Sequence, residues 1–317
     1  MEPKKKMNSY ILAVDGGATK TTLSLRDASG KIYFEKTSTS TNYQAIGIEK
    51  AEKAFSQLLH EAYEATGIQD IAVAAFAVAG IDTKKGQTIV QQIVEQSCRK
   101  SLFRIQHIIV ENDVQSTLIG LTGNDAGALV ISGTGSTAYA TDGKGRIERT
   151  GGWGHRVGDE GSGYWIGREI LNTVFRYEDG RLQKPTVLKD LVYEMLQIDH
   201  IEQLNDWIYQ TNYTNAQIAK ISTVLSKAIS LGDERAIDIA CNAAKELVIM
   251  TDAVLRKIEP IHEGFIVYLN GGVLKNNPVI LKLYKEYMME QYPHISFDLC
   301  NQNPIDYIAN RALRSLK

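Results

Sequence analysis

The stretch that decides the fold is residues 10–27, YILAVDGGATKTTLSLRD. Residues 11–14 are all apolar and predict a buried strand, which Asp15-Gly16-Gly17 ends; Leu23 and Leu25 then alternate with polar residues, as in a second strand. Glycine lets the main chain approach a ligand closely and take positive φ, so that successive N–H groups can converge on a phosphate. Taken alone, the turn is equally compatible with an ordinary hairpin.

The same design occurs a second time in the chain. Residues 127–147, GALVISGTGSTAYATDGKGRI, again give an apolar strand, a turn of glycines and hydroxyls, and an alternating strand. Ser132-Gly133-Thr134-Gly135-Ser136 stands where the first copy has its Asp-Gly-Gly turn. This internal repeat predicts duplication of an α/β unit. Two such turns favour a polyphosphate held in a cleft between two similar domains.

The rest of the chain alternates apolar strands with helical periodicity, which predicts an α/β fold with parallel strand pairs. In the first half we expect strands at 32–35, 71–79 and 108–110, helices at 48–66, 86–98 and 114–122, and a polar loop at 38–42. In the second half we expect helices at 164–177, 219–231, 235–257, 278–292 and 304–316, and strands at 265–269 and 295–299. The predicted domains are 1–124 and 125–317, the second with a largely helical insertion. Whether the final helix, about 304–317, packs back on the first domain is left open.

Composition and charge exclude several classes of function. The 317 residues carry 35 Lys and Arg against 37 Asp and Glu, a net charge of -2, so we expect neither a nucleic-acid nor a membrane partner. Three widely spaced cysteines fit neither a disulfide framework nor a metal knuckle. The apolar run at 11–14 is too short for a signal peptide, and no run is long enough for a membrane helix. We therefore expect a cytoplasmic protein.

Four glycine turns follow apolar strands and are the expected site. They are Asp15-Gly16-Gly17, Gly133-Thr134-Gly135, Gly152-Trp153-Gly154 and Asn270-Gly271-Gly272. Sites in α/β sheets gather at the carboxyl ends of strands, so we expect these turns to converge. No GxxxxGK[ST] loop is present, and no GxGxxG stands in a dinucleotide-binding context. The phosphate site is therefore of another type.

The turns resemble the two phosphate motifs and the adenosine motif of the actin-like ATPase superfamily of sugar kinases and Hsp70. Residues 152–165, GWGHRVGDEGSGYW, are similar to N-acetylglucosamine kinases and the related BadF/BadG-type group, and Ser40-Thr41-Asn42 resembles their sugar-binding loop. The resemblance extends from residue 10 to about 316. It implies two ribonuclease-H-like domains around a cleft, with ATP and Mg²⁺ as cofactors and a small amino sugar as the other substrate.

The resemblance also implies roles for particular residues. Asp113 would be the general base that takes the proton of the sugar's primary hydroxyl, and the alternative is an aspartate that caps the following helix. Asp15 would hold Mg²⁺ through water. Lys20 would neutralise phosphate charge, with a solvated turn lysine as the alternative. The full set implied to bind nucleotide is Gly16, Gly17, Thr19, Lys20, Thr134, Gly135, Ser136, Gly271 and Gly272.

A second set of residues would read the sugar. Asn42, Gly152, Trp153 and Asp159 would bind it together with Asp113. A carboxylate and an amide suit hydroxyl groups, and an indole suits an acetamido methyl or a pyranose face. A structural tryptophan is the alternative reading of Trp153, and a plain strand-ending turn that of Gly271 and Gly272.

The predicted function is phosphorylation of N-acetylglucosamine at its primary hydroxyl, with N-acetylmuramic acid or glucosamine as open alternatives. A more distant alternative is the ATPase activator of a dehydratase or reductase. Such activators carry an iron–sulfur cluster on cysteines at a dimer interface, and Cys98, Cys241 and Cys300 lie far in sequence from the glycine turns. A sugar-responsive regulator would need an N-terminal helix-turn-helix, which nine residues before the first strand cannot supply. A homodimer is compatible with the sequence.

Overall fold

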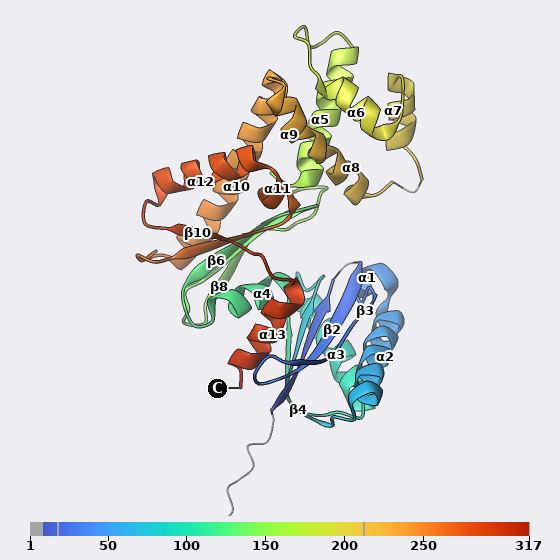
Figure 1. Ribbon diagram of the computed structural model, residues 1–317, viewed down its shortest axis with the longest axis vertical. Coiled ribbons are helices and arrows are strands. Elements are labelled where there is room, and N and C mark those ends of the chain that lie inside the picture. Colours follow the sequence, from blue (N-terminus) through green and yellow to red (C-terminus); the bar gives the residue numbers. More distant parts are fainter. Residues whose placement is uncertain (1–8, 18, 212, 317) are drawn as a thin grey trace, which may run out of the picture. The chain divides into compact units, whose positions relative to one another are not determined.

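The computed structural model describes residues 9–17, 19–211 and 213–316 (Figure 1). They form two compact units. Unit 1 runs to Asp125 and resumes at Asn301, and unit 2 is Ala126–Cys300. The last helix of the chain thus belongs to the first unit, next to the strand with which the described chain begins. Each unit is a five-stranded sheet with helices packed on it.

The sheet of unit 1 has the order β3-β2-β1-β4-β5. Its strands are β1 (Tyr10–Gly16), β2 (Lys20–Asp27), β3 (Ile32–Thr39), β4 (Asp70–Val78) and β5 (Arg104–Glu111). β1, β2 and β3 are antiparallel neighbours, whereas β4 and β5 run parallel to β1. The carboxyl ends of β1, β4 and β5 therefore meet at one edge of this sheet.

Helices pack on both faces of that sheet. Alternate residues of β1 point to opposite faces, so each face receives part of its apolar run. The helices are α1 (Tyr43–Ile46), α2 (Ile48–Thr66), α3 (Lys84–Lys100), α4 (Asp113–Thr122) and α13 (Pro304–Arg314). Leu12 and Val14 pack in a cluster with residues of α2 and α3. Ile11 and Ala13 pack on the other side against Ile308 and neighbouring residues of α13. The side chains of these four apolar residues, 11–14, are fully buried, as their unbroken apolar run predicts.

The sheet of unit 2 repeats that of unit 1. Its strands are β6 (Gly127–Ser132), β7 (Ser136–Thr141), β8 (Ile147–Gly151), β9 (Ile266–Asn270) and β10 (Ser296–Leu299). The order β8-β7-β6-β9-β10 and the strand directions, antiparallel for β6, β7 and β8 and parallel for β6, β9 and β10, match those of unit 1. Two sheets with one topology confirm the duplication that the repeat predicted.

Most of the helical residues of unit 2 lie between β8 and β9. Those between β8 and β9 are α5 (Gly163–Glu178), α6 (Leu188–Leu196), α7 (Ile201–Ile208), α8 (Asn215–Ile221), the 3₁₀ turn η1 (Ser222–Val224), α9 (Leu225–Ser230) and α10 (Glu234–Ile258). Two more, α11 (Gly272–Asn276) and α12 (Pro278–Gln291), lie between β9 and β10. Asp233 caps α10 by accepting a 2.9 Å hydrogen bond from the N–H of Ala236, as expected. The helical insertion is clearly visible in Figure 1, in yellow to orange. No described helix is long and apolar enough to cross a membrane.

Three of the elements that differ from the prediction show the physical reason for the difference. The helix expected at 219–231 is broken into α8, η1 and α9, since Ser222 and Thr223 each donate a hydroxyl hydrogen bond to a carbonyl three residues back. β3 continues to Thr39, into the expected polar loop, because it pairs along β2 as an exposed edge strand and needs no apolar pattern. The short helix α11 was not predicted, because five residues are too few for a periodic signal.

Candidate active site

Carboxylates gather where the parallel strands of unit 1 end. Asp15 lies near the end of β1, Asp82 follows β4, and Asp113 follows β5. Burial, and to a smaller extent the negative charge of Asp113, raise the pKa of Asp15 from 3.8 to about 6, while the charge of Lys20 acts in the opposite direction. Burial also raises the pKa of Asp113, and the charge of Asp82 adds to this effect. The charge of each neighbouring acid therefore affects the pKa of the next. Asp82 was not predicted as a site residue.

Asp113 is the first residue of α4, and Asn112 before it is the cap. The side chain of Asn112 accepts hydrogen bonds from the N–H groups of Val114 at 2.9 Å and Gln115 at 3.4 Å. The alternative reading of Asp113 as the capping aspartate is therefore wrong. The Asp113 carboxylate also accepts from the N–H groups of Val114 and of its own residue, which lowers its pKa against the effect of burial. It sits half-buried in the first turn of a helix, where the helix dipole favours an anion.

The first glycine turn is closely packed by the polar loop after β3. A Cβ on Gly16 would lie 2.8 Å from Oγ1 of Thr41, so a larger residue would have to displace that side chain. The hydroxyl of Ser40 donates to the carbonyl of Gly17 at 3.2 Å. Thr19 and Lys20 beyond the turn are exposed. Both are accessible to a ligand, although Ala18 between them and Gly17 lies outside the described residues.

Asn42 lies at the end of the same loop and caps the short helix α1. Its Oδ1 accepts a 3.0 Å hydrogen bond from the N–H of Gln44, and it would lie 3.1 Å from a Cβ on Gly80. The side-chain oxygen is therefore occupied. What Asn42 can offer to a ligand is its amide nitrogen, a hydrogen-bond donor.

In unit 2 the second and fourth glycine turns lie against each other. A Cβ on Gly271, which has φ of +97°, would lie 2.2 Å from the carbonyl oxygen of Ser132. Only glycine permits this approach, so a plain strand-ending turn does not account for Gly271. The carbonyl of Gly133 accepts a 2.7 Å hydrogen bond from the N–H of Gly163, at the start of α5. The turn after β6 is thus in direct contact with both the turn after β9 and the beginning of α5.

The loop after β8 brings Asp159 to the second glycine turn. Asp159 is buried and has φ of +62°, one of two non-glycine residues with positive φ in the described chain. Its Oδ1 accepts a hydrogen bond from the N–H of Ser136 at 3.3 Å, and a Cβ on Gly135 would lie 3.0 Å from both carboxylate oxygens. Burial raises the pKa of Asp159, and the Ser136 hydrogen bond opposes this shift. Asp159 therefore belongs to the site in unit 2.

Trp153 in the same loop is not a core residue. Its side chain is 65% exposed, and the guanidinium of Arg149 lies 4.6 Å from its ring centroid. Gly152 before it has φ of +71° and donates its N–H to the carbonyl of Ser136 at 2.9 Å. The alternative of a structural tryptophan is not supported, because most of the indole can meet a ligand.

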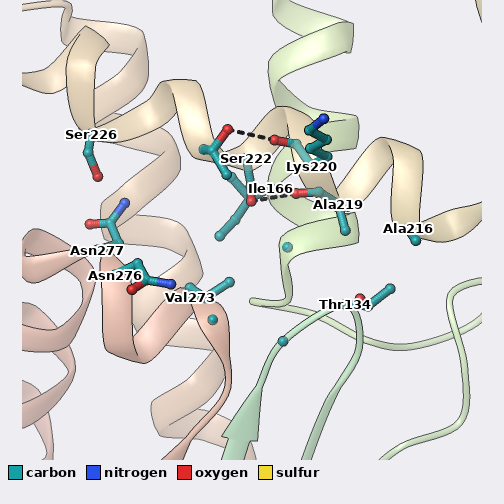
Figure 2. Close-up of a pocket in the computed structure, with 14 residues that line it drawn as sticks. Thr134, Ile166, Ala216, Ala219, Lys220, Ser222, Ser226, Val273, Asn276 and Asn277 are labelled. Carbon is teal, nitrogen blue, oxygen red and sulfur yellow. Dashed lines mark hydrogen bonds between the residues drawn. The ribbon is translucent and has the colours of Figure 1, made fainter. Parts of the chain in front are cut away.

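A cavity of about 540 Å³ opens beside these turns, within unit 2 (Figure 2). Its lining comes from the second and fourth glycine turns, from the start of α5, from α8, η1 and α9, and from α11 and the residue after it. The lining residues are Gly133, Thr134, Gly163, Ile166, Ala216, Ala219, Lys220, Ser222, Thr223, Ser226, Gly272, Val273, Asn276 and Asn277. Its volume is in the range of small-molecule and cofactor sites.

The cavity walls contain residues that the sequence reading did not select. Among them are Ser226, Asn276 and Asn277, which are drawn on the left of Figure 2. They carry neutral donors and acceptors, which suit a nucleoside rather than a charged group. The doubled Asn276-Asn277 shortly after Gly271-Gly272 was a signal that could have indicated α11. Nothing in the sequence marked Ser226.

Two α/β units of one strand order, with acids at the strand ends of the first and glycine turns in both, have the fold of the actin-like ATPases. Solved structures confirm this fold. That of a candidate N-acetylglucosamine kinase from Chromobacterium violaceum covers 96% of this chain and 99% of its own, with a TM-score of 0.70 and 21% identity. That of a ROK family glucokinase from Streptomyces griseus, in complex with glucose and AMPPNP, covers 96% and 98%, with a TM-score of 0.54 and 15% identity.

The chain belongs to the BadF/BadG/BcrA/BcrD ATPase family, whose model matches residues 12–297. It is similar to the N-acetylmuramic acid/N-acetylglucosamine kinase of Clostridium acetobutylicum, with 28% identity over 288 residues, 90% of this chain and 92% of the relative. It is also similar to the N-acetyl-D-glucosamine kinase of Dictyostelium discoideum, with 27% identity over 318 residues, 97% and 98% of the two chains. The family resemblance drawn from the sequence motifs is confirmed.

Proposed function

We propose that this protein is an ATP-dependent kinase that phosphorylates the primary hydroxyl of an amino sugar, with N-acetylglucosamine as the leading substrate. The single observation that carries the proposal is Asp113, a half-buried carboxylate at the start of α4 whose charge acts on the neighbouring Asp15. The relatives named as kinases of N-acetylglucosamine and N-acetylmuramic acid support the substrate class. N-acetylmuramic acid and glucosamine remain the nearest alternatives.

Asp113 acts as the general base. Its carboxylate takes the proton of the sugar's primary hydroxyl as that oxygen forms a bond to the γ-phosphorus. The bond between the γ-phosphorus and the β–γ bridging oxygen breaks, and ADP leaves. Burial raises the pKa of Asp113, and a raised pKa makes its ionised form a stronger base.

Asp15 holds Mg²⁺ through water. The fit rests on two neighbouring carboxylates, Asp15 and Asp113, whose mutual repulsion a divalent cation would relieve. No group of three or more acidic, histidine or cysteine side chains that could hold a metal occurs in the described part of the chain. Mg²⁺ is usually bound through one or two carboxylates plus phosphates. When bound, the ion neutralises the charge that develops on the transferred phosphoryl group.

Gly16, Gly17, Thr19 and Lys20 of unit 1, and Thr134, Gly135 and Ser136 of unit 2, bind the phosphates. The adenosine occupies the cavity beside Gly271 and Gly272. Ser226, Asn276 and Asn277 in the lining support this assignment, because their neutral donors and acceptors suit adenine, which offers one donor group and several acceptors but no charge.

The sugar is read by Asn42, Gly152, Trp153 and Asp159. Asn42 donates from its amide, since its oxygen is occupied by Gln44. Asp159 accepts from sugar hydroxyls with the oxygen that does not bind Ser136. The exposed indole of Trp153 covers an apolar face or the acetamido methyl of the ligand.

We also propose a cytoplasmic location, where ATP is supplied, and leave a homodimer as an option. Cys98, Cys241 and Cys300 form no disulfide, which suits a reducing compartment. Cys98 and Cys300 are buried and so are not presented to a cluster, which disfavours the dehydratase-activator alternative.

The test is a coupled assay of ADP release with purified protein, MgATP and a panel of N-acetylglucosamine, N-acetylmuramic acid, glucosamine, N-acetylmannosamine and glucose. We expect sugar-dependent ADP release, highest for an N-acetylated amino sugar. Asp113→Asn should abolish it and leave ATP binding, measured by calorimetry, unchanged. ADP release that ignores every amino sugar, or full activity in the variant, would contradict the proposal.

A further inference from the structure

We infer that Arg311, on the last helix of the chain, is a positioning residue for Asp113 and acts through Glu111. The inference rests on the proposed role of Asp113 as the base. Arg311 is separated from Glu111 by 200 positions in the sequence, yet the two side chains meet in unit 1. No sequence motif pointed to either residue.

The contact between Arg311 and Glu111 is a bidentate ion pair. Nε of Arg311 donates to both carboxylate oxygens of Glu111, at 3.2 and 3.0 Å, and Nη2 donates to Oε1 at 2.6 Å. The remaining nitrogen, Nη1, donates to the hydroxyl of Ser315 at 2.7 Å. Only 19% of the Arg311 side chain and 13% of the Glu111 side chain is exposed. A planar guanidinium bound in this way fixes both the place and the angle of the carboxylate.

Glu111 stands directly before the base. It is the last residue of β5, where it pairs with Ala77 of β4, and only Asn112 separates it from Asp113. Asn112 is itself buried and holds the first turn of α4. A shift of Glu111 is therefore passed on along the main chain to Asp113, because this short segment contains no glycine that could absorb it.

Helix α13 also fixes α4 further along. A Cβ on Gly120 would lie 2.0 Å from the carbonyl oxygen of Tyr307, so the two helices touch through their backbones. Arg314 donates to the carbonyl of Leu121 at 3.3 Å. The ion pair at Glu111 thus adds a fixed point at the start of α4 to those near its end. Two fixed points determine the direction of a helix, and with it the position of its first residue.

A second ion pair on α13 provides a control, in which the arginine also binds Glu35 at 3.2 Å. Nη2 of Arg26 donates to Oδ1 of Asp306 at 2.7 Å, and the Arg26 side chain is only 9% exposed. This pair ties the same helix to β2, away from the segment that carries Asp113. If the Arg311–Glu111 pair only held α13 in place, breaking either pair would have the same effect on the reaction.

The experiment compares Arg311→Met, Arg311→Lys and Glu111→Gln with Asp306→Asn, all in the full chain and well below each unfolding transition. We expect Arg311→Met and Glu111→Gln to lower kcat about 10- to 100-fold while the KM for ATP changes less than about threefold, as for a misplaced catalytic group. Arg311→Lys, which keeps the charge but not the fork, should recover only part of the loss. Asp306→Asn should lose stability but keep kcat.

A second measurement does not depend on catalysis. Hydrogen exchange should speed up at the amides of Val114 and Gln115 in Arg311→Met, but not in Asp306→Asn. If wild-type protein is active and the Arg311 variants keep its kcat, or if Asp306→Asn loses as much, the inference is overturned and the proposed function stands. If the wild type phosphorylates no sugar, the proposed function fails. The exchange result then still decides whether Arg311 orders this segment.

Discussion

The backbone N–H of Ser136 donates a hydrogen bond to Oδ1 of Asp159 at 3.3 Å. This contact joins a residue of the proposed sugar loop to the second glycine turn, across 23 positions of sequence. It binds one carboxylate oxygen and leaves the other for a ligand. A movement of the loop after β8 would therefore also displace the turn after β6.

Replacing Asp159 by Asn should separate the role of its charge from its role in the loop. Asn tolerates the left-handed conformation and keeps an oxygen for Ser136, so the free energy of unfolding should change by less than about 1 kcal/mol. A hydrogen bond to a charged acceptor is worth about 1.5–3 kcal/mol, so the KM for the sugar should rise at least about tenfold. Kinetics and denaturant unfolding test this. Asp159→Ala, as the comparison, should lose stability as well.

Replacing Trp153 by Ala should affect sugar binding far more than folding. The indole is 65% exposed, so its removal forms no cavity, and the contact with Arg149 accounts for about 0.5–1 kcal/mol. We expect a KM for N-acetylglucosamine about tenfold higher, from the loss of an aromatic contact worth about 1–1.5 kcal/mol. Tyr209→Ala is the control, since Tyr209 is 79% exposed and has no proposed role. An equal KM in both variants would count against Trp153.

Gly271 and Gly264 allow the effect of close packing to be separated from that of backbone strain. Both have positive φ, +97° and +83°, but a Cβ on Gly264 would meet nothing within 4 Å, whereas one on Gly271 would collide with Ser132. Gly264→Ala should cost only the left-handed strain of about 1–2 kcal/mol. Gly271→Ala should cost more and abolish ATP binding. Thermal unfolding and calorimetry measure both, and equal losses would contradict the proposed packing of the two turns.

The metal-free protein should lose stability as the pH rises through the range in which Asp15 ionises. Its pKa is raised from 3.8 to about 6 in the folded state, so between these values the folded protein binds more protons than the unfolded one. The stabilising contribution is complete below about pH 4 and lost above about pH 6, on the order of 2–3 kcal/mol. Asp15→Asn should remove this slope. Urea unfolding in EDTA at several pH values tests it, and a slope of the opposite sign would refute the burial of Asp15.

Local patterns predicted most of the fold. The helix at 48–66 has the bounds that its apolar spacing indicated, and its closing residue, Gly67, takes φ of +64°. The two copies of the strand–turn–strand pattern correspond to sheets of one topology, because each copy is a self-contained hairpin whose register its own alternation determines. Edge strand β3 and the break at Ser222 were not predicted correctly. Their form depends on pairing and on hydroxyl hydrogen bonds, which hydrophobic periodicity does not report.

The sequence by itself determined the two glycine turns, the acids Asp15 and Asp113 that follow apolar strands, and the loop that carries Trp153 and Asp159. These features are local, because a strand and the turn after it lie within a few residues of each other. Only the tertiary structure decided that Asp82 joins the acids, that Asn276 and Ser226 line the cavity, and that Arg311 pairs with Glu111. Such contacts join segments far apart in the chain. They exist only once helix packing and strand order have brought those segments together, and no short-range pattern of residues encodes that order.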